Sequence, residues 1–154
     1  MTLARDVVAR LTELGQTVAT AESLTAGLVC VTLTEVPGSS AVVRGGLVVY
    51  ATELKASLAG VDLGLLAEHG AVHPEVAAQL AIGARERCGA DWGLGLTGVA
   101  GPDPQDGEPV GTVHIGLSGA GVREVRTWRF ADDRAGIRTE SVRAALGLLR
   151  EHLA

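Results

Sequence analysis

Apolar residues recur every three or four positions in several segments of the chain, which is the pattern of an amphipathic helix. In Thr2–Leu14 this spacing begins at a threonine suited to cap a helix, and Gly15 ends it. Spacing, caps and glycine or proline stops predict five further helices. They run from Glu22–Gly27 to about Glu35, from Thr52 to Gly60, over Leu63–His69, over Glu75–Cys88, and from Asp132 or Asp133 to about His152.

Short apolar runs bounded by turn residues predict strands between these helices. The runs are Thr17–Ala21, Leu47–Tyr50, Asp91–Thr97, Gly111–Leu117 and Val122–Phe130. Strands alternate with helices early in the chain, whereas the last two runs flank a short turn and predict a hairpin. This order favours an α/β fold with a mixed sheet covered by helices on both faces.

The composition bounds the class of protein. The 154 residues are 47% hydrophobic and 20% charged, which excludes a disordered chain and suits one domain over residues 1–154. Apolar runs such as Leu47–Ala51 are far shorter than the ~20 residues that span a bilayer. Met1–Arg10 has no apolar signal segment, and Cys30 and Cys88 are expected to be reduced. We therefore expect a cytoplasmic protein with no membrane partner.

The charge argues against nucleic acid as a partner. The formal net charge is −5, the basic residues form no cluster, and aromatic residues make up 3% of the chain. Duplex binding requires clustered basic side chains, and single-strand binding uses aromatic stacking platforms. A small anionic substrate remains compatible with this charge, because one helix N-terminus and one arginine suffice to bind it.

Lys55 stands out in the composition. It is the one lysine among thirteen basic residues, and the other twelve are arginine. A codon bias accounts for the arginines, and Lys55 is either a residue that the bias has spared or one that chemistry requires. Arginine cannot lose its proton in a protein, whereas lysine can act as a base once its pKa is lowered. Lys55 is therefore a candidate for a role that needs a neutral amine.

Ser40, Tyr50 and Lys55 form the main candidate catalytic group. A serine nucleophile with a neutral lysine as its base is a known nucleophile–base pair. One straight strand from Ser40 to Tyr50 would hold the two residues ~33 Å apart. The group therefore requires a helical turn over Ser39–Arg44 and a reversal of the chain near Gly45–Gly46.

Two turns that follow predicted strands are candidate ligand sites. Glu22–Gly27 places the hydroxyls of Ser23 and Thr25 at a helix start, where free N–H groups favour phosphate. A plain helix cap is the alternative interpretation. Thr97–Pro102 ends a strand with glycines that let a ligand approach the backbone, although an ordinary turn has the same composition.

No metal or cofactor is expected. His69 and His73 are four residues apart, but a glycine and a proline break the helix between them and no acidic third ligand is evident. His114 alternates with apolar neighbours in a predicted strand, which favours a structural role. The acidic residues of the loop before it are expected to be solvated: Asp103, Asp106 and Glu108.

Several motifs together resemble the C-terminal domain of the CinA family. They occur in order along nearly the whole chain: Ala21–Gly27, Pro37–Ser40, Gly45–Tyr50, Glu53–Lys55, His69–Val72, Thr97–Pro102 and Pro109–Val113. The chain departs from the usual family pattern at three positions, where Ala26 replaces glycine, Thr52 replaces asparagine and His73 replaces serine.

The resemblance implies a three-layer α/β/α sandwich with a mixed sheet of about five to six strands, no metal, and a serine–lysine amidase. The family includes amidohydrolases that convert nicotinamide mononucleotide to nicotinate mononucleotide and ammonia. On this sequence the resemblance implies Ser40 as nucleophile, Lys55 as base and Tyr50 as an assisting hydroxyl. The expected substrate-binding residues are Ser23, Thr25, Gly27, Thr97, Gly98 and Arg138.

These inferences predict an enzyme of pyridine nucleotide salvage that acts on a phosphorylated nicotinamide nucleotide. The Thr25–Gly27 helix start and Arg138 would bind the phosphate, and backbone amides near Ser39–Ser40 would hold the oxyanion. We also expect a homo-oligomer, in the form of a dimer. The alternatives are a catalytically silent nucleotide-binding or regulatory domain of the same fold, and an amidohydrolase for another small carboxamide.

Overall fold

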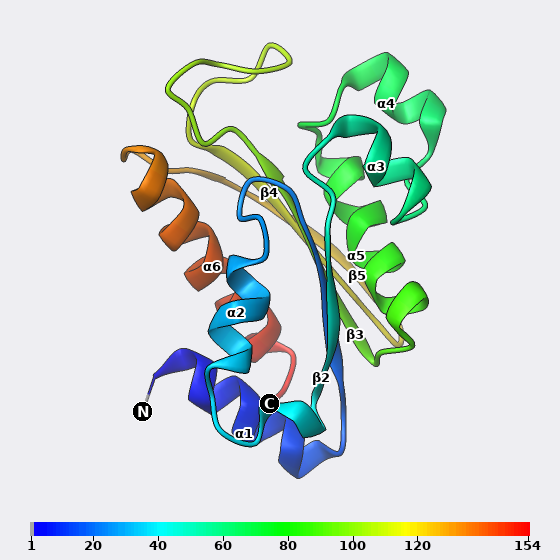
Figure 1. Ribbon diagram of the computed structural model, residues 1–154, viewed down its shortest axis with the longest axis vertical. Coiled ribbons are helices and arrows are strands. Elements are labelled where there is room, and N and C mark those ends of the chain that lie inside the picture. The colour runs from blue at the N-terminus through cyan, green and yellow to red at the C-terminus, as the bar shows by residue number, and fades with distance from the viewer. Residues whose placement is uncertain (1) are drawn as a thin grey trace.

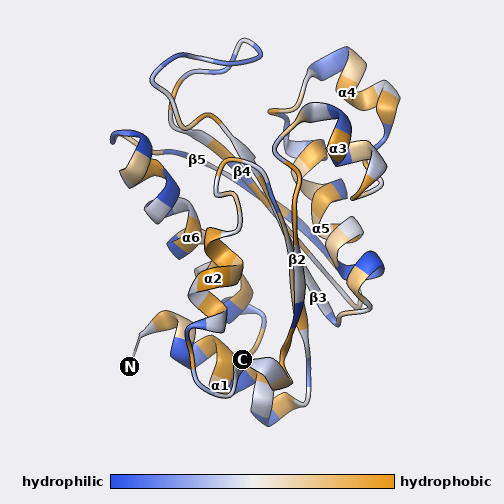
Figure 2. Cartoon of the chain, viewed as in Figure 1, coloured by the Kyte–Doolittle hydropathy of each residue, from blue (hydrophilic) through white to orange (hydrophobic). Residues whose placement is uncertain are grey.

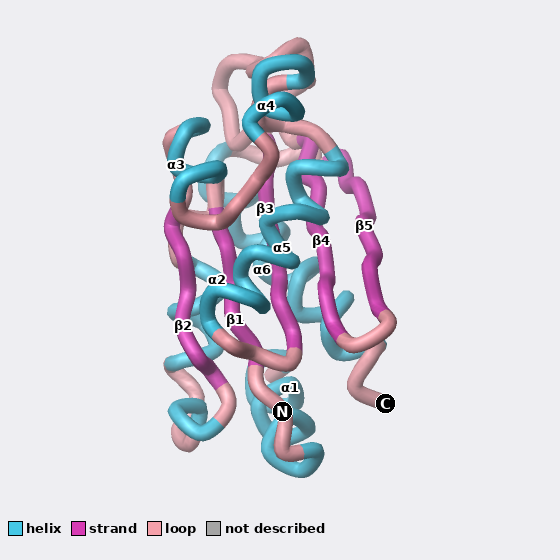
Figure 3. The backbone as a smooth tube through the Cα atoms, turned by 90° about the vertical axis from the view of Figure 1, so that its right-hand side faces the viewer, coloured by secondary structure: helices cyan, strands magenta, loops and turns pink. Residues whose placement is uncertain are grey.

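The computed structural model describes residues 2–154 and contains one five-stranded mixed sheet with the strand order β2-β1-β3-β4-β5. The parallel strands are β1 (Val18–Glu22), β2 (Val43–Val48) and β3 (Trp92–Gly98). The hairpin of β4 (Thr112–Gly119) and β5 (Val122–Arg129) adds to β3 in antiparallel orientation. β2 and β5 are therefore the two edges of the sheet (Figure 3).

Helices cover both faces of the sheet, as the sequence pattern predicted (Figure 1). One layer contains α1 (Leu3–Leu14), α2 (Leu28–Thr34) and α6 (Arg134–Glu151). The other layer contains α3 (Thr52–Ser57), α4 (Leu63–His69) and α5 (Pro74–Cys88). A short 3₁₀ turn, η1 (Ser39–Ala41), precedes β2. The predicted mixed sheet between two helical layers is confirmed.

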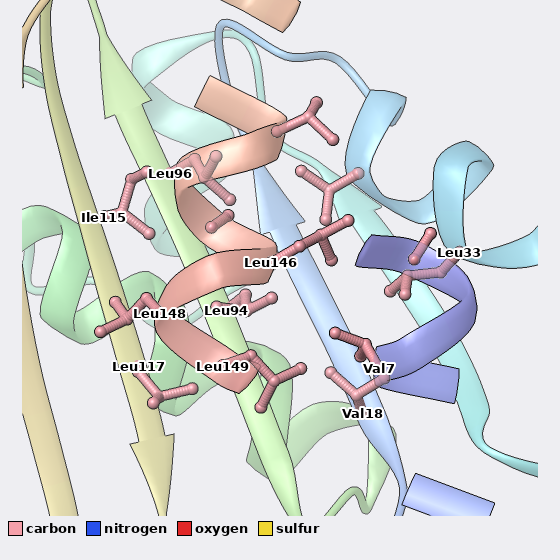
Figure 4. Packing of buried hydrophobic residues seen from close by; sticks show 14 of the residues in the cluster. Val7, Val18, Leu33, Leu94, Leu96, Ile115, Leu117, Leu146, Leu148 and Leu149 are labelled. Atoms are coloured by element: carbon pink, nitrogen blue, oxygen red, sulfur yellow. The ribbon is translucent and has the colours of Figure 1, made fainter. Parts of the chain in front are cut away.

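The larger core lies between the sheet and the layer of α1, α2 and α6. Successive side chains of a strand point to opposite faces, so Leu94 and Leu96 of β3 share one face and pack near Leu146 and Leu149 of α6 (Figure 4). Each fully buried leucine stabilises the fold by ~1.5–3 kcal/mol. Hydrophilic residues gather instead in the loop between β3 and β4 (Figure 2). None of the described helices combines the length and apolarity needed to cross a membrane.

Glycines bring α5 close to the other face of the sheet. Gly93 and Gly95 alternate with the leucines of β3, and Gly116 is the partner of Gly95 on β4. A Cβ atom at Gly95 would lie 2.4 Å from Ala81 N and 2.5 Å from Ala77 O. The alternation of glycine and leucine in β3 thus gives one face that fills a core and one that admits a helix backbone.

The observed bounds of β2 differ from those of the strand predicted from the sequence. The strand was expected over Leu47–Tyr50 after a break at Gly45–Gly46, but both glycines lie inside β2 and pair with β1. A Cβ at Gly46 would lie 2.7 Å from Thr20 Oγ1 and 3.1 Å from Cys30 Sγ. Glycine is therefore present because α2 and β1 approach closely here, and the chain does not reverse.

We expect Gly95→Ala to lower the free energy of unfolding by ~1–3 kcal/mol, because the added methyl group overpacks the contact between β3 and α5. Gly147→Ala in α6 is the matched control, since a Cβ there meets nothing within 4 Å. The control should raise the free energy of unfolding by ~0.5–1 kcal/mol through helix propensity. Urea denaturation of both variants measures the difference, and an equal effect of the two substitutions would contradict this account of the packing.

Candidate active site

The carboxyl ends of the three parallel strands border a cleft of about 140 Å³. Its lining includes Ser23 after β1, Tyr50 after β2, Thr97 and Gly98 at the end of β3, and Arg134 at the start of α6. Ligands of open α/β sheets bind at this kind of position. A larger groove of about 580 Å³ between α1, α2 and α6 contains none of the predicted site residues.

The buried carboxylate of Glu22 organises the turn that carries Ser23. Glu22 ends β1 and is fully buried. One carboxylate oxygen accepts hydrogen bonds from Thr25 Oγ1 at 2.7 Å and from Val29 N at 2.9 Å. The other accepts from Thr20 Oγ1 at 3.0 Å and Cys30 N at 3.1 Å. Four donors from a strand, a turn and a helix therefore converge on one anion.

This arrangement corrects the expectation that the helix start at Thr25–Gly27 binds phosphate. The first free N–H groups of α2 already donate to the Glu22 carboxylate, so an anion of the protein itself fills that place. Thr25 is fully buried and its hydroxyl donates to Glu22. Neither group is free to bind a substrate.

Ser23 lies where β1, β2 and β3 end side by side. Glu22 pairs with Val48, and Val49 N donates to Glu22 O at 2.9 Å, so Ser23 and Val49 continue the ladder as neighbours. Ser23 N donates to Leu96 O of β3 at 3.1 Å. Ser23 is 8% exposed and lines the cleft. The serine is therefore held by backbone hydrogen bonds beside the turn that follows β2.

Lys55 reaches this same turn from α3. Its side chain is 1% exposed, and Nζ donates to Val49 O at 2.8 Å and to Tyr50 O at 3.1 Å. Val49 N donates to Glu22 O, and Ser23 follows Glu22 directly, so the amine binds a backbone carbonyl of the turn beside Ser23. The structure thus brings together Ser23, Tyr50 and Lys55.

Burial lowers the pKa of Lys55 to about 8, because it removes water from the ammonium form. The negative charges of Asp106 and Glu53 oppose this effect and are weaker. A nearby arginine would lower this pKa further, because a second cation disfavours the ammonium form. The structure instead places Arg44 at the far end of β2, where Nε donates to Cys88 O at 3.0 Å.

β2 separates Ser40 from the cleft within one chain. Ser40 lies in η1 before the strand, whereas Tyr50 and Lys55 follow it. Six strand residues span ~20 Å. The expected grouping of Ser40 with Tyr50 and Lys55 is therefore not formed inside one chain. The backbone amides near Ser39–Ser40, expected to hold the oxyanion, are removed from the cleft by the same distance.

Two arginines of α6 reach the turns around the cleft, and of these Arg134 lines the cleft itself, whereas only Arg138 was predicted from the sequence. Arg138 Nη2 donates to Thr25 O at 3.4 Å, while its buried Nε has no partner among the described residues. Arg134 Nη2 donates to the hydroxyl of Tyr50 at 3.1 Å. The two arginines are four residues apart and share a helix face. That spacing was the signal by which Arg134 could have been found.

The loop after β3 forms another wall of the cleft. Thr97 is buried and its hydroxyl donates to Ala71 O at 2.7 Å, so it positions the turn before α5. Asp106 Oδ2 accepts from Ala71 N at 3.0 Å. Asp106 is exposed, as expected of a solvated loop residue, and it also binds the turn before α5, while its charge raises the pKa of Lys55.

The three histidines considered as possible metal ligands or structural residues each contact a nearby side chain. The rings of His69 and His73 stack with centroids 4.4 Å apart, and His114 Nδ1 lies 2.7 Å from Thr127 Oγ1. Burial lowers the pKa of His114. Among residues 2–154 no group of three or more histidine, cysteine or acidic side chains is arranged to hold a metal ion.

Comparison with known proteins places this geometry in a family. The model of the CinA C-terminal domain matches residues 1–153. The chain is 53% identical over 148 residues to a CinA-like protein of Frankia casuarinae, covering 96% of this chain and 34% of that protein. It is 49% identical over 148 residues to a CinA-like protein of Geobacter sulfurreducens, with 95% and 36% coverage. The chain thus spans about a third of the length of these curated relatives.

Solved structures show the same architecture. The competence/damage inducible protein CihA from Agrobacterium tumefaciens is 40% identical, with a TM-score of 0.92 over 96% of this chain and 91% of that one. A CinA superfamily protein from Escherichia coli is 31% identical, with a TM-score of 0.90 and coverage of 97% and 90%.

Proposed function

We propose that this chain, which belongs to the CinA C-terminal domain family, hydrolyses the carboxamide of nicotinamide mononucleotide to nicotinate mononucleotide and ammonia, in pyridine nucleotide salvage. The observation that carries the proposal is the environment of Lys55. A neutral amine has two hydrogens and one lone pair. The two carbonyls of Val49 and Tyr50 accept two hydrogens, which leaves the lone pair free to take a proton.

Ser23 is the nucleophile in this proposal. Its proton passes to Lys55 Nζ as Ser23 Oγ forms a bond to the carboxamide carbon. The backbone N–H of Leu24, which also lines the cleft, would stabilise the oxyanion. The C–N bond then breaks, and the proton held by Lys55 leaves with the nitrogen as ammonia. Water attacks the acyl ester, its proton passes through Lys55, and Ser23 regains its hydroxyl.

Arg134 and Arg138 are the phosphate-binding groups in this proposal. The cleft of about 140 Å³ accommodates the pyridine carboxamide rather than a whole nucleotide. The ribose phosphate would extend toward α6, where both guanidinium groups face the turns that border the cleft. With the helix start of α2 filled by Glu22, Arg134 and Arg138 are the guanidinium groups of α6 that reach the turns beside the cleft.

The assay that tests the proposed function is ammonia release from nicotinamide mononucleotide, its riboside and free nicotinamide. The mononucleotide should be the best substrate, because it alone offers both the carboxamide and the phosphate. Calorimetric binding of the mononucleotide with no ammonia release would replace the amidase with a nucleotide-binding domain. Faster release from an unrelated small carboxamide would identify a different amidohydrolase.

Alanine substitution at each of the two candidate serines, Ser23 and Ser40, distinguishes their roles. Ser23→Ala should lower kcat by ~10³-fold or more, since removal of a nucleophile typically leaves only a small residual rate. Ser40→Ala should retain most of kcat, because Ser40 lies at the opposite end of β2 from Lys55. Steady-state kinetics on both variants, with circular dichroism as the folding control, decides the assignment. The reverse pattern would transfer the nucleophile to Ser40.

The role of Lys55 as the base is tested by the pH dependence of the rate and by substitution with arginine. Lys55 accepts a proton only when it is neutral. We therefore expect kcat/KM to be low at pH values well below 8 and to increase as the pH rises through about 8. Lys55→Arg retains the positive charge but cannot accept a proton, and it should lose most of kcat. Because the site is buried, thermal unfolding must show that the variant is folded. A folded Lys55→Arg variant with the rate and pH profile of the wild type would refute the mechanism.

The phosphate site is tested on two substrates. Arg138→Ala should raise KM for the mononucleotide about tenfold or more, since a hydrogen bond to a charged group contributes ~1.5–3 kcal/mol. The same substitution should have little effect on the riboside, which lacks the phosphate. Arg143→Ala on the same helix is the control, because Arg143 is exposed and pairs with Glu140. Equal losses on both substrates would remove Arg138 from the phosphate site.

A further inference from the structure

Three of the four histidines of the chain lie around the start of α5, beside the cleft: His69, His73 and His114. His69 ends α4, and His73 directly precedes α5. His114 of β4 shares a face of the sheet with Gly116, where an added Cβ would lie 2.4 Å from Ala77 O of α5. None of the three takes part in the proposed reaction, and histidine is the side chain that changes charge near neutral pH.

The ring of His73 is the N-cap of α5 and can hold the helix start only while one of its nitrogens carries no proton. Nδ1 accepts a hydrogen bond from Glu75 N at 3.1 Å. The imidazolium form has a proton on both ring nitrogens and cannot accept this bond. It would also place a positive charge at a helix N-terminus, where the dipole favours negative charge. Protonation of His73 therefore removes the cap of α5.

The ring of His114 is buried beneath the same helix start. It is 4% exposed, Nδ1 lies 2.7 Å from Thr127 Oγ1, and the buried Nε2 has no partner among residues 2–154. A second proton on this ring would bury a cation with an unpaired N–H group. Burial lowers the pKa of His114, and the charge of Glu108 opposes this effect. Positive charge on His73 or Arg129 lowers the pKa of His114 further.

The acidic groups that face this helix start from α4, α5 and the loop after β3 already contact other groups. They are Glu68, 3.8 Å from His69 Nε2, Glu75, which pairs with Arg123 of β5, and Asp106, which accepts from Ala71 N at 3.0 Å. The ring of His69 stacks on that of His73 with centroids 4.4 Å apart. Two charged rings in this stack would repel each other.

The turn that these histidines border is one wall of the cleft. Ala71 and Val72 of this turn are buried and line the cleft. Thr97 Oγ1 donates to Ala71 O at 2.7 Å, and the cap of α5 holds the far end of the turn. Thr97 is also the partner of His114 across β3 and β4. The cap, the buried histidine and the wall of the cleft therefore form one small unit.

We infer that the start of α5 is an acid-sensitive latch on the cleft, formed by the turn 70–73 and the first turn of the helix. While His73 and His114 are neutral, the cap is intact and the turn is closed onto β3. When both rings take protons, the cap breaks, positive charges gather at one helix end, and the turn opens.

The direction of the pH dependence follows from His114. In an open segment this ring regains the ordinary pKa of ~6.5, which lies above its pKa in the closed form. The open form therefore binds the proton more readily. The closed latch keeps its full stability above this pH and loses stability as the pH falls below it.

Amide hydrogen exchange of the whole chain at about pH 7.5 and about pH 5 tests the latch without an assay of activity. After correction for the intrinsic exchange rate, the protection of the Ala71 and Glu75 amides should fall about tenfold or more at the lower pH, the effect of one pKa unit. The Gly136 amide is the matched control and should change little, because its cap is the carboxylate of Asp133, at 2.8 Å. Unchanged protection of Ala71 and Glu75 would overturn the latch.

His73→Ser separates the presence of the cap from its titration. Serine is a preferred N-cap residue and gains no charge in acid, so α5 should stay capped and most of the pH dependence at Ala71 should disappear. His152→Gln removes the histidine that follows α6 and should retain the full pH dependence. A His73→Ser variant with the pH dependence of the wild type, or a His152→Gln variant without it, would contradict the assignment.

Ring NMR signals of the wild type give a second measurement that needs no variant. His114 should take its proton only as the protection of the Ala71 amide is lost. A His114 ring that titrates while the turn stays closed would refute the latch. Ammonia release is unsuited to this test, because protonation of Lys55 lowers the rate in the same direction. A chain that releases no ammonia would refute the proposed function and leave the latch standing.

Discussion

The structure around the cleft depends on one buried anion. The carboxylate of Glu22 lies at the end of β1 and accepts hydrogen bonds from a strand, the following turn and the first turn of α2. An ionised carboxylate is costly to bury unless such donors surround it, and an unmade bond would leave a polar group unsatisfied. The hydrogen bonds that the buried carboxylate requires therefore fix the position of Ser23, which follows Glu22 directly.

The buried amine of Lys55 has a different environment from the carboxylate of Glu22. Lys55 has no carboxylate within its hydrogen bonds and meets only the carbonyls of Val49 and Tyr50. The anion of Glu22 is fully satisfied, whereas the amine is dehydrated and its charged form is disfavoured. Glu22 at the end of β1 and Lys55 on α3 therefore differ in how completely hydrogen bonds compensate their charges.

Much of the fold could be predicted from local pattern, because the helices have caps and periodic apolar faces and β3 alternates glycine with leucine. Gly45–Gly46 misled that analysis, since a glycine pair is typical of a turn and the close approach of Cys30 and Thr20 is a property of the tertiary structure. Because the chain was expected to reverse at these glycines, Ser40 was wrongly expected to lie beside Tyr50 and Lys55. Lys55 was identified from composition alone, whereas Arg134 and Asp106 had no signal of comparable strength.

The burial of the sole lysine has a consequence for handling the protein. Amine-directed reagents, such as succinimidyl esters, require an accessible neutral amine, and Lys55 is 1% exposed in the folded chain. No other side chain carries an amine that such a reagent could reach. Acylation of a lysine therefore records an opening of the turn after β2, so the protein carries a built-in chemical label for that local motion.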